Sequence, residues 1–186
     1  MTDNSSLPTR KSSPTWHLYS DQTERGGKTI ATITQDPLSD SILIEGKLIG
    51  IIGANGTRVG FVGVRKGVRF APSALIITFE ASGLDGLHAH FAMETARDSA
   101  LGIEGHLTYQ CKLAPVSGET YSADLSLAQP IVRGRVIPAN LVPALLPQDI
   151  LTAGLEIRLS EQEGKDIGVP FRIEIKSQFS ATRFRI

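Results

Sequence analysis

The sequence predicts an all-β protein, an antiparallel β-sandwich of the jelly-roll type. Several short segments alternate strictly between apolar and charged side chains, as strands with one buried and one wet face do. Glycine, proline, asparagine and aspartate gather between these segments, where turns are expected. Pro138, Pro143 and Pro147 exclude a long helix from the stretch that separates two of the strands. Short strands with turns between them and no convincing helix are typical of a sandwich.

The expected strands follow one another along most of the chain. They span residues 28–35, 41–52, 58–65, 74–81, 87–94, 103–113, 155–159 and 171–176. Asn55-Gly56 predicts a tight hairpin between the second and third of them, and 82–86 predicts a turn before the strand at 87. The end of the chain, 178–186, alternates again, so it is either an extra edge strand or a strand that pairs with a partner.

Length and composition predict one domain with an N-terminal tail. The chain has 186 residues, of which 1–15 are rich in Ser, Thr and Pro and are expected to be disordered, while 16–186 form the sandwich. Lys plus Arg and Asp plus Glu each number 19, so nothing in the net charge favours nucleic-acid binding. With no long apolar run and no signal peptide, we expect a soluble protein of the cytoplasm, or of an organellar matrix or stroma in a eukaryote, with no insertion into a membrane.

No motif in the chain predicts catalysis or a cofactor. The segment 50–57 is rich in glycine, but it lacks the lysine and the following helix of a phosphate-binding loop, which favours the hairpin. There is no Gly-x-Ser-x-Gly elbow, and the single cysteine, Cys111, shares an apolar strand face with Tyr109 and Leu113. We therefore expect Cys111 to be an inert thiol of the core.

Polar residues that share one strand face form a candidate ligand site. In the strand at 87–94, His88, His90 and Glu94 point away from the core side, and in the next strand His106 and Gln110 do the same. Such a surface suits a sugar or another small ligand, although sugar sites usually present aromatic rings and only 6% of this chain is aromatic. Three histidines can also hold zinc, but a metal enzyme needs a converging acid that the sequence does not show.

Arginines supply a second candidate site. Arg133 and Arg135 flank Gly134 and point to one side if that segment is extended. The guanidinium fork suits carboxylates, phosphates or the backbone of a partner, and the alternative is a structural salt link to an acid in a loop. Together with Arg65 they form a candidate patch for a protein partner.

The remaining charged residues on the strands are expected to be structural. Glu156 and Glu174 occupy the wet positions of their strands, where they balance neighbouring cations such as Arg158 and Lys176. Both glutamates are therefore predicted to face solvent.

A series of motifs, in order, resembles the complex I intermediate-associated protein family. They are Trp16, Asp21, Gly26-Gly27, Glu45-Gly46-Lys47-Leu48, the Gly60-Phe61 strand ending at Arg65, Asp85-Gly86, Arg133-Gly134-Arg135 and the segment from Pro170 to Ile175. No single motif is specific, but their order and spacing extend over nearly the whole chain, from residue 16 to about residue 176.

This resemblance implies a galactose-binding-like jelly roll and a role without catalysis. Members of the family are assembly chaperones for respiratory complex I or parts of photosystem biogenesis factors. The resemblance therefore predicts an assembly factor that binds a protein partner, such as a subunit of a respiratory or photosynthetic membrane complex. The alternative is a carbohydrate-binding or small-ligand-binding module that uses the histidine-bearing face.

Overall fold

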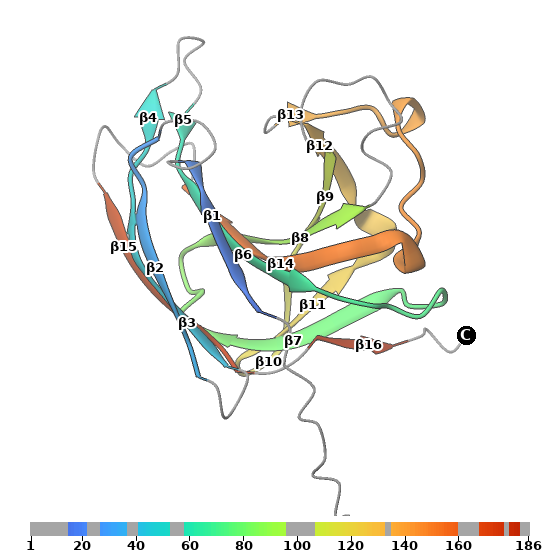
Figure 1. The fold of residues 1–186 in the computed structure, drawn as a ribbon, viewed down its shortest axis with the longest axis horizontal. Helices are drawn as coiled ribbons and strands as arrows, with labels where there is room; N and C mark the ends of the chain where they lie inside the picture. The colour runs from blue at the N-terminus through green and yellow to red at the C-terminus, as the bar shows by residue number, and fades with distance from the viewer. Residues whose placement is uncertain are drawn as a thin grey trace, which may run out of the picture.

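The computed structural model describes residues 15–21, 27–36, 41–52, 58–95, 107–132, 135–159, 168–176 and 179–182. Over these ranges the chain forms two facing antiparallel sheets, which confirms the predicted all-β sandwich (Figure 1). Consecutive strands cross repeatedly between the two sheets, as in a jelly roll. The predicted disordered tail falls almost entirely outside the described residues.

The first sheet, which we call sheet A, has seven strands in the order β1-β6-β14-β8-β9-β12-β13. Their bounds are β1 (His17–Ser20), β6 (Phe61–Gly67), β14 (Ile150–Arg158), β8 (His88–Thr95), β9 (Leu107–Lys112), β12 (Gln129–Val132) and β13 (Arg135–Val136). The longest strands, β14 and β8, lie side by side near its middle (Figure 1). Sheet A therefore collects strands from both ends of the sequence.

The second sheet, sheet B, has seven strands, six of them in the order β10-β11-β7-β15-β3-β2. They are β10 (Ala114–Ser117), β11 (Thr120–Asp124), β7 (Ile76–Ser82), β15 (Val169–Ile175), β3 (Ile42–Leu48) and β2 (Ile30–Gln35). A further strand, β16 (Ser180–Thr182), pairs with β7, so this part of the chain end pairs within its own fold. A separate ribbon joins β4 (Ile51–Ile52) to β5 (Arg58–Val59).

The predicted turns and helix breaks agree with the structure where it describes them. Gly83 and Gly86 both have positive φ angles, 80° and 75°, in the turn between β7 and β8. The antiparallel pairing of β4 with β5 fits the predicted hairpin, although Asn55-Gly56 itself lies outside the described residues. The helical turns that the structure describes between 125 and 149 are short 3₁₀ turns, η2 (Leu125–Leu127), η3 (Ala139–Leu141) and η4 (Pro147–Asp149), and strands β12 and β13 lie between η2 and η3. Within the described ranges, no helix is long and apolar enough to cross a membrane.

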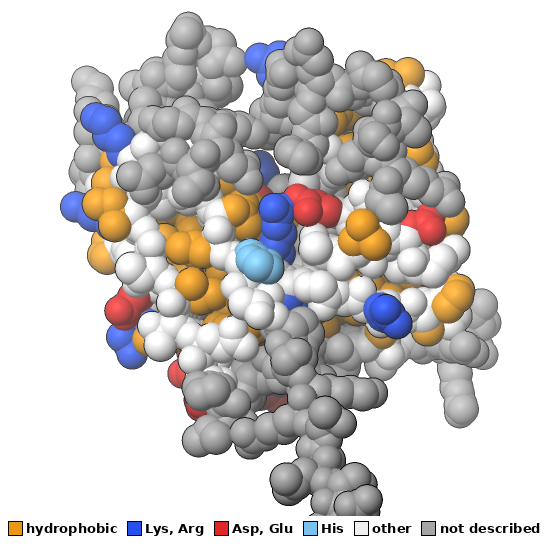
Figure 2. Space-filling view, in the orientation of Figure 1, with side chains coloured by type: hydrophobic (Ala, Val, Ile, Leu, Met, Phe, Trp, Pro, Cys, Tyr) orange, Lys and Arg blue, Asp and Glu red, His pale blue; other side chains and the backbone are white. Residues whose placement is uncertain are grey.

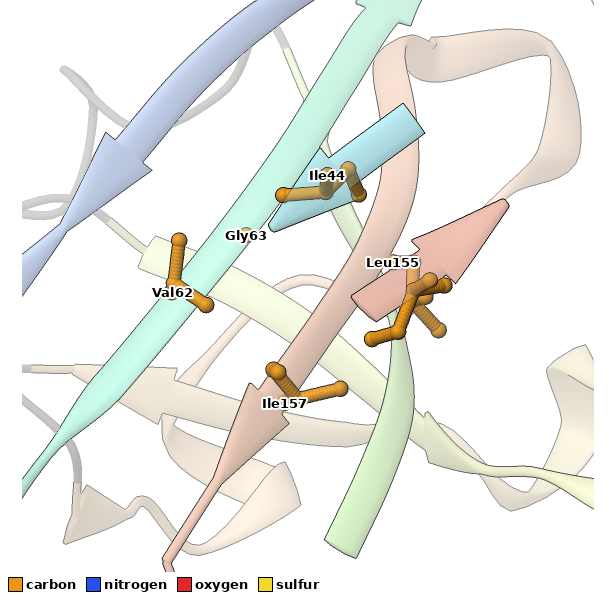
Figure 3. A pocket seen from close by; sticks show the side chains of 6 residues that line it. Ile44, Val62, Gly63, Leu155 and Ile157 are labelled. Carbon is orange, nitrogen blue, oxygen red and sulfur yellow. The ribbon is translucent and has the colours of Figure 1, made fainter. Parts of the chain in front are cut away.

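The core lies between the two sheets and is mainly apolar, with Lys66 buried against the Trp16 ring. Phe91 of β8 and Leu155 of β14 face Ile173 of sheet B, and all three are almost fully buried. A small gap lined by Ile44, Val62, Gly63, Leu155, Ile157 and Ile173 has no room for a water molecule, so it belongs to the packing and is no ligand site (Figure 3). Cys111 is 1% exposed, and burial, with a smaller contribution from Asp124, raises its pKa to about 12. Its predicted role as a core thiol is confirmed.

Candidate functional site

The outer surface of sheet A, away from the core, carries a concentration of polar side chains. Residues directly opposite one another in the ladder point to the same side of a sheet. His90 lies opposite Glu156 of β14 and Lys112 of β9, and His88 lies opposite Arg158 of β14. We call this surface the polar face; it comprises Tyr19, Arg65, His88, His90, Glu94, Gln110, Lys112, Thr152, Glu156 and Arg158. Figure 2 shows His, cationic and anionic side chains close together over β6, β14 and β8.

At the centre of the polar face is the carboxylate of Glu156, which is only 4% exposed. Tyr19 Oη donates a hydrogen bond to its Oε2 at 3.2 Å, and Gln110 Nε2 donates to its Oε1 at 3.2 Å. Arg158 Nε donates to the same Oε1 at 2.5 Å. Three donors, one of them cationic, satisfy a charge that would otherwise be costly to bury.

The prediction that Glu156 faces solvent is therefore wrong. It occupies the outer side of its strand, as alternation requires, but side chains from other strands cover it. Tyr19 reaches it from β1 and Gln110 from β9, and neither of these strands is hydrogen-bonded to β14. Glu174, predicted in the same way, is exposed on sheet B.

Gly63 allows Tyr19 to reach Glu156. A Cβ built on Gly63 would lie 2.3 Å from Tyr19 Cζ, which no real contact permits, so the ring crosses β6 where the side chain is missing. The Arg65 guanidinium lies 5.0 Å from the centroid of the same ring, within the range of a cation–π interaction. Sequence reasoning missed Tyr19, although a glycine inside a strand pattern is a recognised indication that another group approaches closely.

A second ion pair neutralises the other glutamate of the polar face. Arg65 of β6 pairs with Glu94 of β8, and Thr152 Oγ1 of β14 donates to Glu94 Oε2 at 3.1 Å. The ion pair reaches across β14, where the residue in register with Arg65 is Gly154, which has no side chain. The sequence assigned Arg65 to the partner patch and Glu94 to the ligand face, and the structure brings the two residues together.

His90 is the least satisfied residue of this surface. Its Nδ1 is buried and has no hydrogen-bond partner within the described part of the chain. Burial lowers the pKa of His90 below its usual 6.5, and Arg158 lowers it further. His88 and Lys112 act in the same direction, while Glu156 opposes them. Near neutral pH the His90 ring is therefore uncharged, and its buried Nδ1 adds nothing to the hydrogen bonds of the described residues.

The structure does not gather the other predicted residues into one site. Arg135 is exposed on β13 opposite Val132, a core residue, so it lies on the opposite side of sheet A from the polar face. Five strand-to-strand steps separate β13 from β6, so Arg65 lies about 24 Å away along the sheet. Arg133 and His106 are outside the described residues. Among the residues that the structure does describe, no group of three or more His, Cys, Asp or Glu could hold a metal ion.

Comparison with known proteins gives distant structural neighbours. No protein-family model matches the chain, and no characterised protein matches its sequence. One solved structure similar to it is a family 11 carbohydrate-binding module from Clostridium thermocellum in complex with a β-1,3-1,4-mixed-linked tetrasaccharide. It has 12% identity and a TM-score of 0.47, over 94% of this chain and 92% of that chain. The family 11 module of the cellulosomal cellulase Lic26A-Cel5E of the same organism has 13% identity and a TM-score of 0.47, over 88% of each chain.

Proposed function

We propose that this protein is a non-catalytic binding module that takes a hydroxyl-rich ligand, a carbohydrate, on the polar face. The observation that carries the proposal is the prearranged network around buried Glu156, whose carboxylate holds the partly exposed Tyr19 hydroxyl and Arg158 guanidinium in fixed positions on the outer surface. Sugar hydroxyls both donate and accept hydrogen bonds, so they are matched by just such fixed planar groups. The partly exposed ring of His90 lies in register beside Glu156 and extends this surface.

The aromatic side chains of this surface support the same class of ligand. Sugar rings stack their C–H faces on aromatic rings, and Tyr19 lies across the sheet with its hydroxyl held by Glu156. Phe61 packs beside it with ring centroids 6.3 Å apart but is buried, so the partly exposed Tyr19 ring is the one that offers a sugar a stacking surface. The low aromatic content of the chain counted against a sugar site, but the aromatic residues that matter are those on this one face.

The test is a titration of the ¹⁵N-labelled protein with a panel of soluble oligosaccharides, followed by NMR. We expect amide shifts in β8, β9 and β14, and we expect His90→Ala to weaken binding about fivefold to tenfold, the value of one hydrogen bond. The matched control is Arg172→Ala, an exposed residue of sheet B that pairs with Glu45. Absence of any saccharide-induced shift, or shifts that map to sheet B, would overturn the proposal.

A second candidate is the binding of a protein partner at the far edge of sheet A. Val136 and Leu141 are both 59% exposed and lie close in sequence to Arg135, so this edge combines apolar side chains with a cation. Apolar residues with arginine are common anchors of protein interfaces. Affinity purification from host membranes should then retain subunits of a respiratory or photosynthetic complex. Loss of those subunits from Arg135→Ala/Val136→Ser would support this role, and their retention by the variant would exclude this edge.

A further inference from the structure

Four basic side chains meet on three adjacent strands of the polar face. His88 and His90 are two residues apart on β8 and therefore point the same way, about 7 Å apart. Arg158 of β14 lies directly opposite His88, and Lys112 of β9 lies directly opposite His90. Directly opposite residues have Cβ atoms about 5 Å apart. One small anionic group at this place is within reach of several of the four.

Lys112 gives this cluster a positive charge that no described residue of the protein balances. Both glutamates of the polar face are already paired, Glu94 with Arg65 and Glu156 with Arg158. Lys112 is exposed and has no acidic partner in the part of the chain that the structure describes. Arg158 gives its Nε to Glu156, and its terminal nitrogens have no partner there either. The cluster thus keeps donors and positive charge for something outside the chain.

The electrostatic environment of His90 also indicates an excess of positive charge at this cluster. Apart from burial, the groups that act on it are Arg158 and Glu156 of β14, His88 of its own strand and Lys112 of β9. Three of these four disfavour its protonation, so the positive potential at the ring exceeds what Glu156 cancels. An anion here would meet a favourable field.

We infer that the polar face selects an acidic saccharide, whose carboxylate or sulfate group is held between His88, His90, Lys112 and Arg158. This inference rests on the proposed function and narrows it from carbohydrates in general to anionic ones. Hydrogen bonds between a charged donor and a carboxylate or sulfate are stronger than those to a neutral hydroxyl, so the charged group would decide among ligands of the same shape. The neutral network around Glu156 and Tyr19 would then position the sugar ring itself.

A matched set of ligands tests the inference. Cellotetraose, the corresponding β-1,4-linked glucuronate tetramer and cellotetraose sulfated at O6 share one backbone and differ at C6 alone. Isothermal titration at neutral pH and low salt should show one of the acidic tetramers binding about tenfold more tightly than cellotetraose, the value of one charge-assisted contact. Which acidic tetramer binds more tightly distinguishes carboxylate from sulfate. The preference should shrink as salt is added, because screening weakens a partly exposed charge pair.

Variants show whether the preference arises at this cluster. Lys112→Gln should reduce the ratio of acidic to neutral affinity about threefold to fivefold, as expected for a partly exposed charge contact. Lys176→Gln is the matched control, since it removes the same charge from the end of β15 in sheet B, where Lys176 pairs with Glu119. If cellotetraose binds as tightly as the acidic tetramers, the inference fails and the proposed function stands. If neither these tetramers nor any saccharide of the panel shifts residues of the polar face, the proposed function fails and the inference fails with it.

Discussion

Replacing Glu156 by alanine tests whether the network at the centre of the polar face is as tightly built as the structure indicates. The substitution leaves the Gln110 amide, which is 6% exposed, without its acceptor, at a cost of about 1–3 kcal/mol. Tyr19 and Arg158 are partly exposed, so water replaces their lost bonds at little cost. The cavity left by the side-chain methylenes of Glu156 adds about 1 kcal/mol to this cost. Removal of a buried charge offsets part of the summed cost. We expect the free energy of unfolding to fall by about 2–3 kcal/mol.

Urea unfolding of Glu156→Ala and Glu174→Ala measures this difference directly. The two glutamates occupy equivalent positions in alternating strand patterns, but Glu174 is exposed, so its removal should change stability by less than about 0.5 kcal/mol. For a chain of this size, the loss at Glu156 corresponds to a melting temperature lower by about 4–12 °C. Equal, small effects for the two variants would refute the account of Glu156 as a buried acceptor of three hydrogen bonds.

Three further predictions concern single residues. Gly63→Ala should lower the free energy of unfolding in urea by about 1–3 kcal/mol, because the added Cβ would displace the Tyr19 ring. The control is Gly67→Ala on the same strand, which should be nearly neutral because nothing lies within 4 Å of the added Cβ. Equal effects of the two substitutions would contradict the packing of Tyr19 over Gly63. Burial lowers the pKa of His90 below 6.5 in the folded state, so as the pH falls the unfolded chain binds a proton at this residue before the folded chain does. The free energy of unfolding should therefore decrease as the pH drops through 6.5, and His90→Gln should make this dependence on pH shallower. An unchanged pH dependence in the variant would argue against the lowered pKa. Cys111, whose pKa burial raises to about 12, should resist iodoacetamide at pH 8 until the protein unfolds, and rapid labelling of the native protein would contradict its place in the core.

Local alternation accounts for the parts of the fold that were predicted correctly. The period of two residues depends on the strand alone, so it correctly placed His88, His90, Glu94 and Gln110 on the outer side of β8 and β9. The same pattern placed Cys111 in the core. The hairpin of β10 and β11 went unpredicted because every residue of β10 is exposed, so burial imposes no alternation there.

The expected strand at 41–52 shows where local patterns stop being sufficient. Its apolar residues continue without a turn, yet the structure divides it into β3, which pairs in sheet B, and β4, whose pairing partner among the described strands is β5. Which strands pair depends on segments far away in the sequence, and alternation carries no information about them.

The sequence by itself determined that this chain is a β-sandwich and which side of each strong strand faces the core, because both follow from the spacing of apolar residues. The tertiary structure alone decided which side chains on the outer side are buried and which of them pair with one another. Glu156 is buried and Glu174 exposed because Tyr19, 137 residues away, and Gln110, 46 residues away, are brought over Glu156 by the strand order of sheet A. The same order pairs Arg65 with Glu94 and separates it from Arg135. A binding face is assembled from several strands, so its chemistry is set by which strands become neighbours and in what register.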